Sequence, residues 1–421
     1  MAMPQLLALL VLPLCVALDA MRMPAAKPVP ITVFSGFLGA GKTTLLERCL
    51  SNSAGLTIGC VVNDVAALNV DGLVARGASP DADGVVTMSN GCACCTGRDG
   101  LVEGIVALQR AAAARGGRWD HIVVEATGIA EPSSLRDALA TRLPRAAGAA
   151  LDSLVTVVDA AEFAGLWGSG DRLADRRELG LGGLASVYDL VATAGVWRPV
   201  ADLLAEQVEC ADLVVLNKCD LAGENGAAAA AAAAAALNPA AAAVRTVRCD
   251  VALEAALGFA GGAGAAAARR PACLGDAAAR PAHFAAATHV YERRRPFAPE
   301  RLAAALEDGG VLEGVLRSKG FCWLASSDAD AFYWSHAGAA FEASATAPWW
   351  RVGDGERRTA LAFIGAGGVD AARIDAALDA CLLEDREWGL YNATGDDEQR
   401  GWNFGTPDVF YARRVGQRPP P

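Results

Sequence analysis

One strand, a glycine-rich loop and the start of a helix constrain the fold of this chain more than any other feature. Residues 29–35 read Val-Pro-Ile-Thr-Val-Phe-Ser, a β-branched run typical of a buried strand. The next residues have the Gly-x4-Gly-Lys-Thr spacing of a phosphate-binding loop and lead into a helical Leu-Leu-Glu-Arg. Backbone N–H groups of such a loop point at phosphate oxygens, and the helix N-terminus favours their negative charge. The residues expected to bind phosphates are Gly36, Gly39, Gly41, Lys42, Thr43 and Thr44.

A second strand carries an acid at its end. His121-Ile-Val-Val-Glu125 is followed by Ala-Thr-Gly128. A carboxylate at a strand tip beside a phosphate loop binds Mg²⁺, and a glycine three residues later can approach the γ-phosphate. We therefore expect Lys42 to contact the β- and γ-phosphates, with Thr43 and Glu125 holding Mg²⁺. The competing interpretation of Glu125 is a strand-end carboxylate that faces solvent.

A third strand ends in a motif that selects the base. Residues 211–217 are apolar and end at Asn217, followed by Lys218, Cys219 and Asp220. A carboxylate at the position of Asp220 accepts both N–H groups on one edge of guanine, and adenine lacks that pair of donors. We expect Asn217 to orient the base and the stem of Lys218 to pack on it. The motif predicts GTP rather than ATP.

The order of elements predicts a doubly wound α/β domain. Apolar strands at 57–64 and 154–159 add to the three above, and helical stretches separate them, which places the nucleotide at the carboxyl edge of the sheet. Beyond it, strands within 283–292, 320–325 and 359–364 and helices at 299–306 and 369–383 predict a smaller α+β domain. Trp323, Trp334, Trp349 and Trp350 are expected in its core rather than on a docking surface. The predicted divisions are a presequence or disordered terminus (1–27), a nucleotide-binding domain (28–275), the α+β domain (276–395) and a mostly disordered tail (396–421).

Three cysteines lie close together in Asn90-Gly91-Cys92-Ala93-Cys94-Cys95. Neighbouring cysteines on a turn are poorly placed to bridge one another, but their thiolates can converge on a soft ion such as Zn²⁺ or Cu⁺. A redox-active thiol pair is the competing interpretation. The other cysteines are scattered, and Cys49, Cys60, Cys210 and Cys322 are expected to be small buried hydrophobes.

Composition limits the partners and the compartment. With 48 acidic and 37 basic residues the net charge is −11, which disfavours nucleic-acid binding. The apolar run from Leu6 to Leu18 is shorter than the roughly 20 residues of a membrane span, so no stable membrane insertion is expected. Thiol chemistry predicts a reducing compartment: the cytoplasm, or an organelle such as a plastid if the apolar N-terminus is a cleaved targeting signal.

Taken together, the motifs resemble the CobW-like family of P-loop GTPases. The resemblance rests on residues 36–46, Ser89-Asn-Gly-Cys-Ala-Cys-Cys-Thr, Val124-Glu-Ala-Thr-Gly and Asn217-Lys-Cys-Asp in this order, and on Tyr291-Glu-Arg-Arg-Arg-Pro-Phe in the later domain. It implies GTP hydrolysis coupled to metal binding at Cys92, Cys94 and Cys95. The implied function is a Zn²⁺ metallochaperone whose client protein docks on the C-terminal domain.

Two other functions stay open within the resemblance: delivery of Co²⁺ for cobalamin synthesis, and a zinc-responsive regulatory GTPase with little turnover. The chain also departs from the family pattern at two places. It has Asn63-Asp64 where the family usually has Asn-Glu, and it lacks the His-rich loop of many members, having only 4 His in all.

Overall fold

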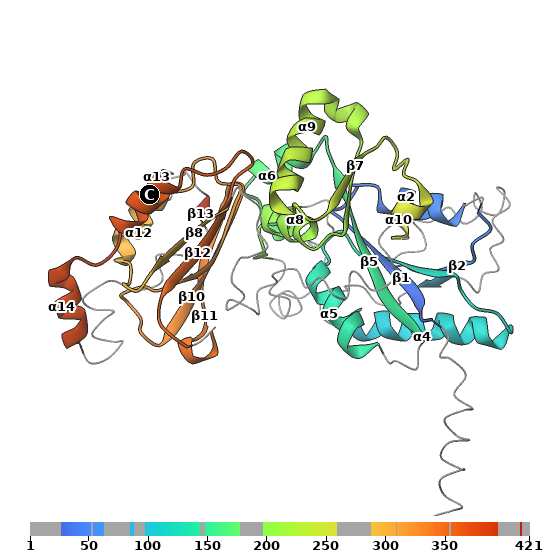
Figure 1. Ribbon diagram of the computed structural model, residues 1–421, viewed down its shortest axis with the longest axis horizontal. Coiled ribbons are helices and arrows are strands. Elements are labelled where there is room, and N and C mark those ends of the chain that lie inside the picture. Colours follow the sequence, from blue (N-terminus) through green and yellow to red (C-terminus); the bar gives the residue numbers. More distant parts are fainter. Residues whose placement is uncertain are drawn as a thin grey trace, which may run out of the picture.

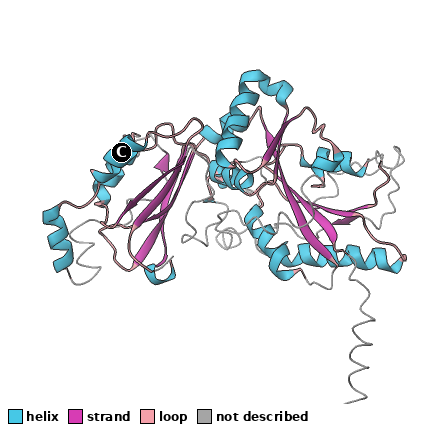
Figure 2. Ribbon diagram, in the orientation of Figure 1, coloured by secondary structure: helices cyan, strands magenta, loops and turns pink. Residues whose placement is uncertain are grey.

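The computed structural model describes two sheets and the helices packed on them (Figures 1 and 2). The described residues are 27–51, 54–62, 85–87, 97–143, 148–176, 197–258, 288–308, 310–352, 355–394 and 413–414. The predicted presequence, the junction predicted near residue 275 and most of the predicted tail lie outside these residues. None of the described helices is long and apolar enough to cross a membrane.

The first sheet has seven strands, all parallel, in the order β3-β2-β4-β1-β5-β6-β7. Its strands are β1 (Val29–Ser35), β2 (Ile58–Val62), β3 (Val85–Thr87), β4 (His121–Glu125), β5 (Ala149–Asp159), β6 (Leu213–Asn217) and β7 (Ala242–Arg245). Its helices are α2 (Lys42–Leu50), α4 (Gly97–Ala114), α5 (Pro132–Arg142), α6 (Phe163–Gly168), α8 (Val200–Glu209), α9 (Cys219–Leu237) and α10 (Leu253–Ala256).

Both faces of this sheet are buried, as a parallel sheet requires. Successive residues of β1 point to opposite faces: Ile31 and Val33 pack with α4 and α5, whereas Phe34 packs with α2 and α10. Figure 1 shows α4 and α5 on one side of the strands and α2 and α10 on the other. The expected doubly wound α/β fold is confirmed.

Strand order brings the predicted site residues to one edge. β1 lies between β4 and β5, and Phe34 of β1 is in register with Glu125 of β4. Asp159 and Asn217 are likewise opposite one another at the ends of β5 and β6. Because the strands are parallel, their carboxyl ends meet at the same edge, where the loop after β1 also lies.

The second sheet has six strands in the order β13-β11-β10-β9-β12-β8, and its pairings are antiparallel. The strands are β8 (Thr288–Arg293), β9 (Arg317–Cys322), β10 (Asp330–Ala337), β11 (Ala340–Pro348), β12 (Thr359–Ile364) and β13 (Arg413–Arg414). The helices are α12 (Pro299–Glu307), α13 (Ala371–Asp379) and α14 (Asp385–Ala393). This is the smaller α+β domain that the sequence predicts.

The core of the second domain lies between its sheet and α12 and α13. Trp334 is fully buried there beside Phe341 and Phe363, and its indole N–H donates to Ser318 Oγ at 2.8 Å. Trp323 and Trp349 are buried in a second cluster with α14. The prediction that these tryptophans are core residues is therefore confirmed for the three; the side chain of Trp350 is outside the described set.

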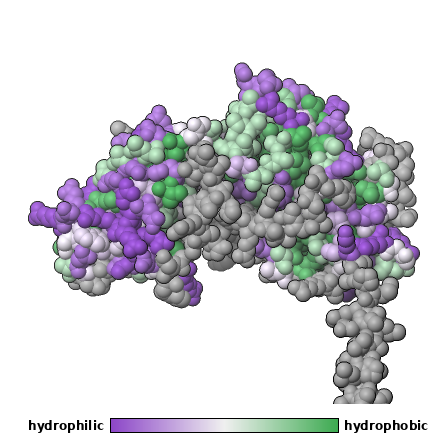
Figure 3. All heavy atoms as spheres, viewed as in Figure 1, coloured by the Kyte–Doolittle hydropathy of each residue, from purple (hydrophilic) through white to green (hydrophobic). Residues whose placement is uncertain are grey.

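The alanine tract at 227–236 forms the second half of α9. Ala227, Ala230 and Ala234 are buried at helical spacing, and the remaining alanines give the paler green surface over α9 in Figure 3. In the same view the end of the molecule that carries α12 to α14 is mainly hydrophilic.

Candidate nucleotide-binding site

The phosphate loop is already folded around its lysine. Lys42, the first residue of α2, is buried and donates from Nζ to the carbonyl oxygens of Gly36 and Phe37, each at 2.9 Å. Burial lowers the pKa of Lys42 to about 8, although the nearby Glu125 carboxylate opposes this shift. An anion placed in the loop would raise this pKa again, which suits a residue that binds phosphates.

Only glycine fits at the N-cap of α2. Gly41 has φ of 115°, and a Cβ atom there would lie 2.5 Å from Asn217 Nδ2. Side chains rarely adopt this φ, and the contact is too short for any Cβ. Glycine is thus required at position 41 for two reasons. The backbone turn needs a positive φ, and Asn217 at the end of β6 leaves no room for a side chain.

Thr43 and Glu125 meet as the sequence predicts. The Thr43 hydroxyl donates to Glu125 Oε1 at 2.6 Å, across 82 residues of sequence. Burial raises the pKa of Glu125, while the Thr43 hydrogen bond and the Lys42 charge act in the opposite direction. Two oxygen donors, one of them a carboxylate, form a set that fits Mg²⁺. Glu125 itself is partly buried, and its carboxylate contacts Thr43.

The turn after Glu125 lies against the phosphate loop. A Cβ atom at Gly128 would be 2.6 Å from both the backbone nitrogen and Cγ of Leu38. The absence of a side chain at Gly128 therefore allows the two loops to touch.

Asn217 connects the phosphate loop to a segment that the sequence did not reveal. Its Nδ2 donates to Ala40 O at 2.9 Å, and its Oδ1 accepts from Cys249 N at 2.8 Å and from Thr246 Oγ1 at 3.3 Å. The segment from Thr246 to Cys249 follows β7, and Arg248 and Cys249 both have positive φ. Because these residues match no motif, only the fold shows that they adjoin the predicted guanine site.

The rest of the guanine motif lies at the start of α9. Lys218 has a left-handed backbone, φ 60° and ψ 34°, and its Nζ pairs with Asp159 Oδ2 at 2.6 Å. Asp220 is exposed in the first turn of the helix. Its carboxylate has no hydrogen bond or ion pair with any residue that the structure describes.

A cavity of about 630 Å³ adjoins the site between α2 and the segment after β7. Thr44 and Arg48 line it on one side and Arg248 and Leu253 on the other. Of the residues predicted to bind the nucleotide, Thr44 alone lines this cavity.

The thiol cluster Cys92, Cys94 and Cys95 lies outside the described residues, as does Asp64. Within the described part of the chain, no group of three metal-binding side chains comes together, and no disulfide joins the described cysteines. Cys49, Cys60, Cys210 and Cys322 are buried, as predicted. Burial raises the pKa of the Cys60 and Cys322 thiols to about 12, so neither is a ready thiolate.

A parallel sheet with a phosphate loop after its central strand, an acid on the neighbouring strand and an Asn-Lys-x-Asp motif on β6 defines a P-loop GTPase. The chain belongs to the CobW family of these proteins. The model of the CobW/HypB/UreG nucleotide-binding domain matches residues 30–245, and that of the cobalamin synthesis protein CobW C-terminal domain matches residues 286–382. The resemblance drawn from the motifs is confirmed.

Several characterised proteins are similar to this chain. Zinc-regulated GTPase metalloprotein activator 1 of Dictyostelium discoideum is 31% identical over 415 residues, covering 89% of this chain and 83% of the relative. Zinc chaperone CobW of Sinorhizobium sp is 35% identical over 208 residues, 47% of this chain and 53% of that protein. A crystal structure of zinc(II)-bound YjiA GTPase from Escherichia coli aligns with 85% of this chain and 100% of its own, at 20% identity and a TM-score of 0.37.

Proposed function

We propose that this protein is a GTP-hydrolysing metallochaperone that binds Zn²⁺ through Cys92, Cys94 and Cys95 and delivers it to a metal-dependent client protein. The observation that carries the GTPase part is the pairing of Thr43 with Glu125 beside the buried Lys42. The metal part is supported by the Cys-x-Cys-Cys sequence and by relatives named zinc chaperone and zinc-regulated metalloprotein activator.

Each nucleotide-binding residue has a separate task in this proposal. Lys42 neutralises charge on the β- and γ-phosphates, and Asp220 accepts the two N–H groups of guanine. Asn217 bonds both to the phosphate loop and to the segment after β7. These bonds fix the distance between the part of the site that binds the phosphates and the part that binds the base. Mg²⁺ held by Thr43 and Glu125 would neutralise charge that develops on the phosphate oxygens.

Zinc is the cargo of this cycle. The thiol cluster lies in sequence between the phosphate loop and Glu125. A change of nucleotide that moves either of these two parts can therefore change the positions of the thiols. Delivery requires that the GTP and GDP states differ in zinc affinity. If GTP bound the zinc-loaded and the zinc-free protein equally well, its hydrolysis could not change the affinity for zinc. The client docks on the C-terminal domain, and thiol ligands require a reducing compartment.

Zinc affinity measured in both nucleotide states tests the proposal. Chelator competition with a non-hydrolysable GTP analogue and then with GDP is expected to show at least about a tenfold loss with GDP, roughly 1.4 kcal/mol. Replacing Cys92, Cys94 and Cys95 with serine should abolish tight binding. Cys219→Ser is the matched control, because Cys219 is partly exposed and its thiol donates a hydrogen bond to the Leu216 carbonyl, which a serine hydroxyl can also make.

Other outcomes point to other functions. Equal zinc affinities with both nucleotides would contradict nucleotide-driven delivery and favour a zinc-responsive regulator. Preference for Co²⁺ over Zn²⁺ in direct competition would favour cobalt delivery.

A further inference from the structure

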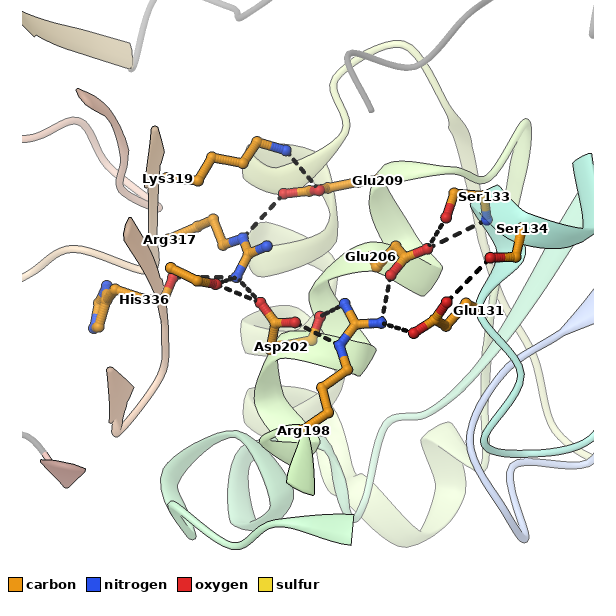
Figure 4. A network of polar contacts seen from close by, with 11 residues as sticks. Glu131, Ser133, Ser134, Arg198, Asp202, Glu206, Glu209, Arg317, Lys319 and His336 are labelled. Atoms are coloured by element: carbon orange, nitrogen blue, oxygen red, sulfur yellow. Dashed lines mark hydrogen bonds and ion pairs between the residues drawn. The ribbon is translucent and has the colours of Figure 1, made fainter. Parts of the chain in front are cut away.

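Helix α8 stands between the two domains and carries acidic side chains toward both. Asp202, Glu206 and Glu209 are four and three residues apart, a spacing that places them along one side of a helix. Figure 4 shows Asp202 and Glu209 directed to the C-terminal sheet and Glu206 directed to Ser133 in the first turn of α5.

On the C-terminal side the main partner is Arg317, the first residue of β9, which is only 1% exposed. Its guanidinium pairs with Asp202, lies 3.3 Å from Glu209 Oε1 and donates to Ser335 Oγ at 3.2 Å. Ser335 in turn donates to Asp202 Oδ1 at 2.7 Å, and Lys319 pairs with Glu209 Oε2 at 2.8 Å. A buried guanidinium needs such acceptors, so β9 and α8 are held in one relative position.

On the side of the nucleotide-binding domain, polar contacts join α8 and Arg198 to Glu131 and Ser133, which follow Glu125 in the chain. Arg198, just before the helix, contacts Asp202 Oδ2 and Glu206 Oε2, each at 2.5 Å, and Glu131 Oε1 at 3.4 Å. Glu206 also accepts from the hydroxyl and the backbone N–H of Ser133. The segment from Glu131 to Ser133 is therefore linked through Arg198 to Asp202, which also pairs with Arg317 of the C-terminal domain.

A second contact reaches the turn beside the phosphates. Gln207 of α8 is buried and donates from Nε2 to the carbonyl of Gly128 at 3.2 Å. Gly128 lies against Leu38 of the phosphate loop. The contacts therefore run without a break from Arg317 through α8 to Gly128 and the phosphate loop.

We propose that Arg317, a residue of the C-terminal domain, is a positioning residue for GTP hydrolysis, because through α8 it fixes the segment 126–133 that follows Glu125 and packs on the phosphate loop. The inference rests on the proposed GTPase activity. Arg317 touches no nucleotide-binding residue, so it acts through Asp202, Arg198 and Glu206. The C-terminal domain, and a client docked on it, can thereby affect hydrolysis.

The test compares five full-length proteins: wild type, Arg317→Met, Arg317→Lys, Arg317→Met with Asp202→Asn, and Arg301→Met. Arg301→Met is the matched control, because Arg301 pairs with Glu387 at 2.7 Å wholly within the C-terminal domain. For each we would measure GTP turnover at saturating GTP, affinity for GDP and for a non-hydrolysable GTP analogue, and the melting temperature.

Arg317→Met is expected to lower turnover by at least about tenfold and to weaken the GTP analogue more than GDP, because the segment it positions faces the γ-phosphate. Adding Asp202→Asn neutralises a buried carboxylate that has lost one of its two guanidinium partners, so it should recover melting temperature without recovering turnover. Arg317→Lys keeps the positive charge but has fewer hydrogen-bond donors, so its GTP turnover should lie between those of Arg317→Met and the wild type.

Two results would overturn the inference: turnover of Arg317→Met equal to that of Arg301→Met, or recovery of turnover together with melting temperature in the double variant. The second result would mean that Arg317 only stabilises the fold. Failure of the proposed GTPase function is distinguishable, because the wild-type protein itself would then not hydrolyse GTP.

Discussion

At the scale of single residues, the site depends on a lysine that is buried before any phosphate arrives. Lys42 has two backbone carbonyl contacts at 2.9 Å and the Glu125 charge nearby, yet burial still lowers its pKa to about 8. Bound triphosphate adds several negative oxygens next to Nζ and must raise this pKa again. Nucleotide binding is therefore linked to protonation of Lys42.

The affinity for GTP is consequently expected to fall as the pH rises above about 8. Below that value Lys42 is already charged, and above it each binding event takes up a proton. Calorimetry in two buffers of different ionisation enthalpy should show uptake near zero at about pH 7 and most of one proton at about pH 9. Binding without proton uptake at the higher pH would contradict the role assigned to Lys42.

Gly128→Ala is expected to weaken GTP binding by about 1–3 kcal/mol, the usual cost of overpacking. The added methyl would lie 2.6 Å from the Leu38 nitrogen, so the phosphate loop or the turn after β4 must move. Gly165→Ala in α6 is the control, because a Cβ there has no neighbour within 4 Å. Fluorescent-nucleotide titration of both variants checks this, and equal affinities would show that the contact is dispensable.

At the scale of elements, each domain has, among its described residues, one buried histidine that ties strands or turns together. His121 in β4 bonds through Nε2 to Thr32 Oγ1 of β1 at 2.8 Å, and Thr32 also donates to Leu257 O after α10. His336 in β10 bonds through Nε2 to the carbonyl of Gly338 at 3.0 Å. Burial is the main cause that lowers the pKa of each histidine to about 4.

Both histidines should make the protein less stable in acid. An unfolded chain binds a proton at each of them as the pH falls below about 6.5, whereas the folded chain resists until about 4, so the free energy of unfolding decreases through this window by up to about 3 kcal/mol per histidine. Above pH of about 6.5 the effect is absent. Urea unfolding across this range measures it.

His121→Gln and His336→Gln separate the two contributions, because each removes one titrating group and keeps a side chain that can hydrogen-bond. Each variant should show a shallower fall in stability with acid than the wild type. Parallel curves for wild type and variants would assign the acid sensitivity to other groups.

At the scale of the whole molecule, the two sheets are joined by charged and apolar contacts together. Ala337 of β10 packs in the same cluster as α6, α8 and α9, and the Ala339 N–H donates to the Trp167 carbonyl at 3.3 Å. Beside these contacts lie Asp202 and Arg317. Burial alone would raise the pKa of Asp202, but the Arg317 and Arg198 guanidiniums outweigh it and lower this pKa. Removing Arg317 thus leaves Asp202 buried with only one of its two guanidinium partners, Arg198.

Arg317→Met is therefore expected to cost about 3–5 kcal/mol in the free energy of unfolding, the usual range for breaking a buried pair. The double replacement with Asp202→Asn should cost less than Arg317→Met alone. Denaturant unfolding of the two single variants and the double variant gives the coupling free energy of the pair. Simple addition of the two single effects would show that the pair is not coupled.

Much of the nucleotide-binding domain was predictable because its signals are local. The strands at 29–35 and 121–125 have the predicted bounds, and the loop between β1 and α2 follows from the spacing of its glycines. In the second domain the strand at 359–364 was also predicted, whereas β10 and β11 were not, since β11 reads Ala-Phe-Glu-Ala-Ser-Ala-Thr-Ala-Pro and lacks a strong apolar alternation.

By itself the amino-acid sequence determined many of the elements, the phosphate loop, the guanine motif and the family, because each depends on residues that are neighbours along the chain. Tertiary structure alone decided that Asn217 holds Ala40 and Cys249, and that Arg317 meets Asp202 across 115 residues. Hydrogen bonds and ion pairs depend on distance in space, and strand order and domain packing set that distance. No local spacing in the sequence encodes it.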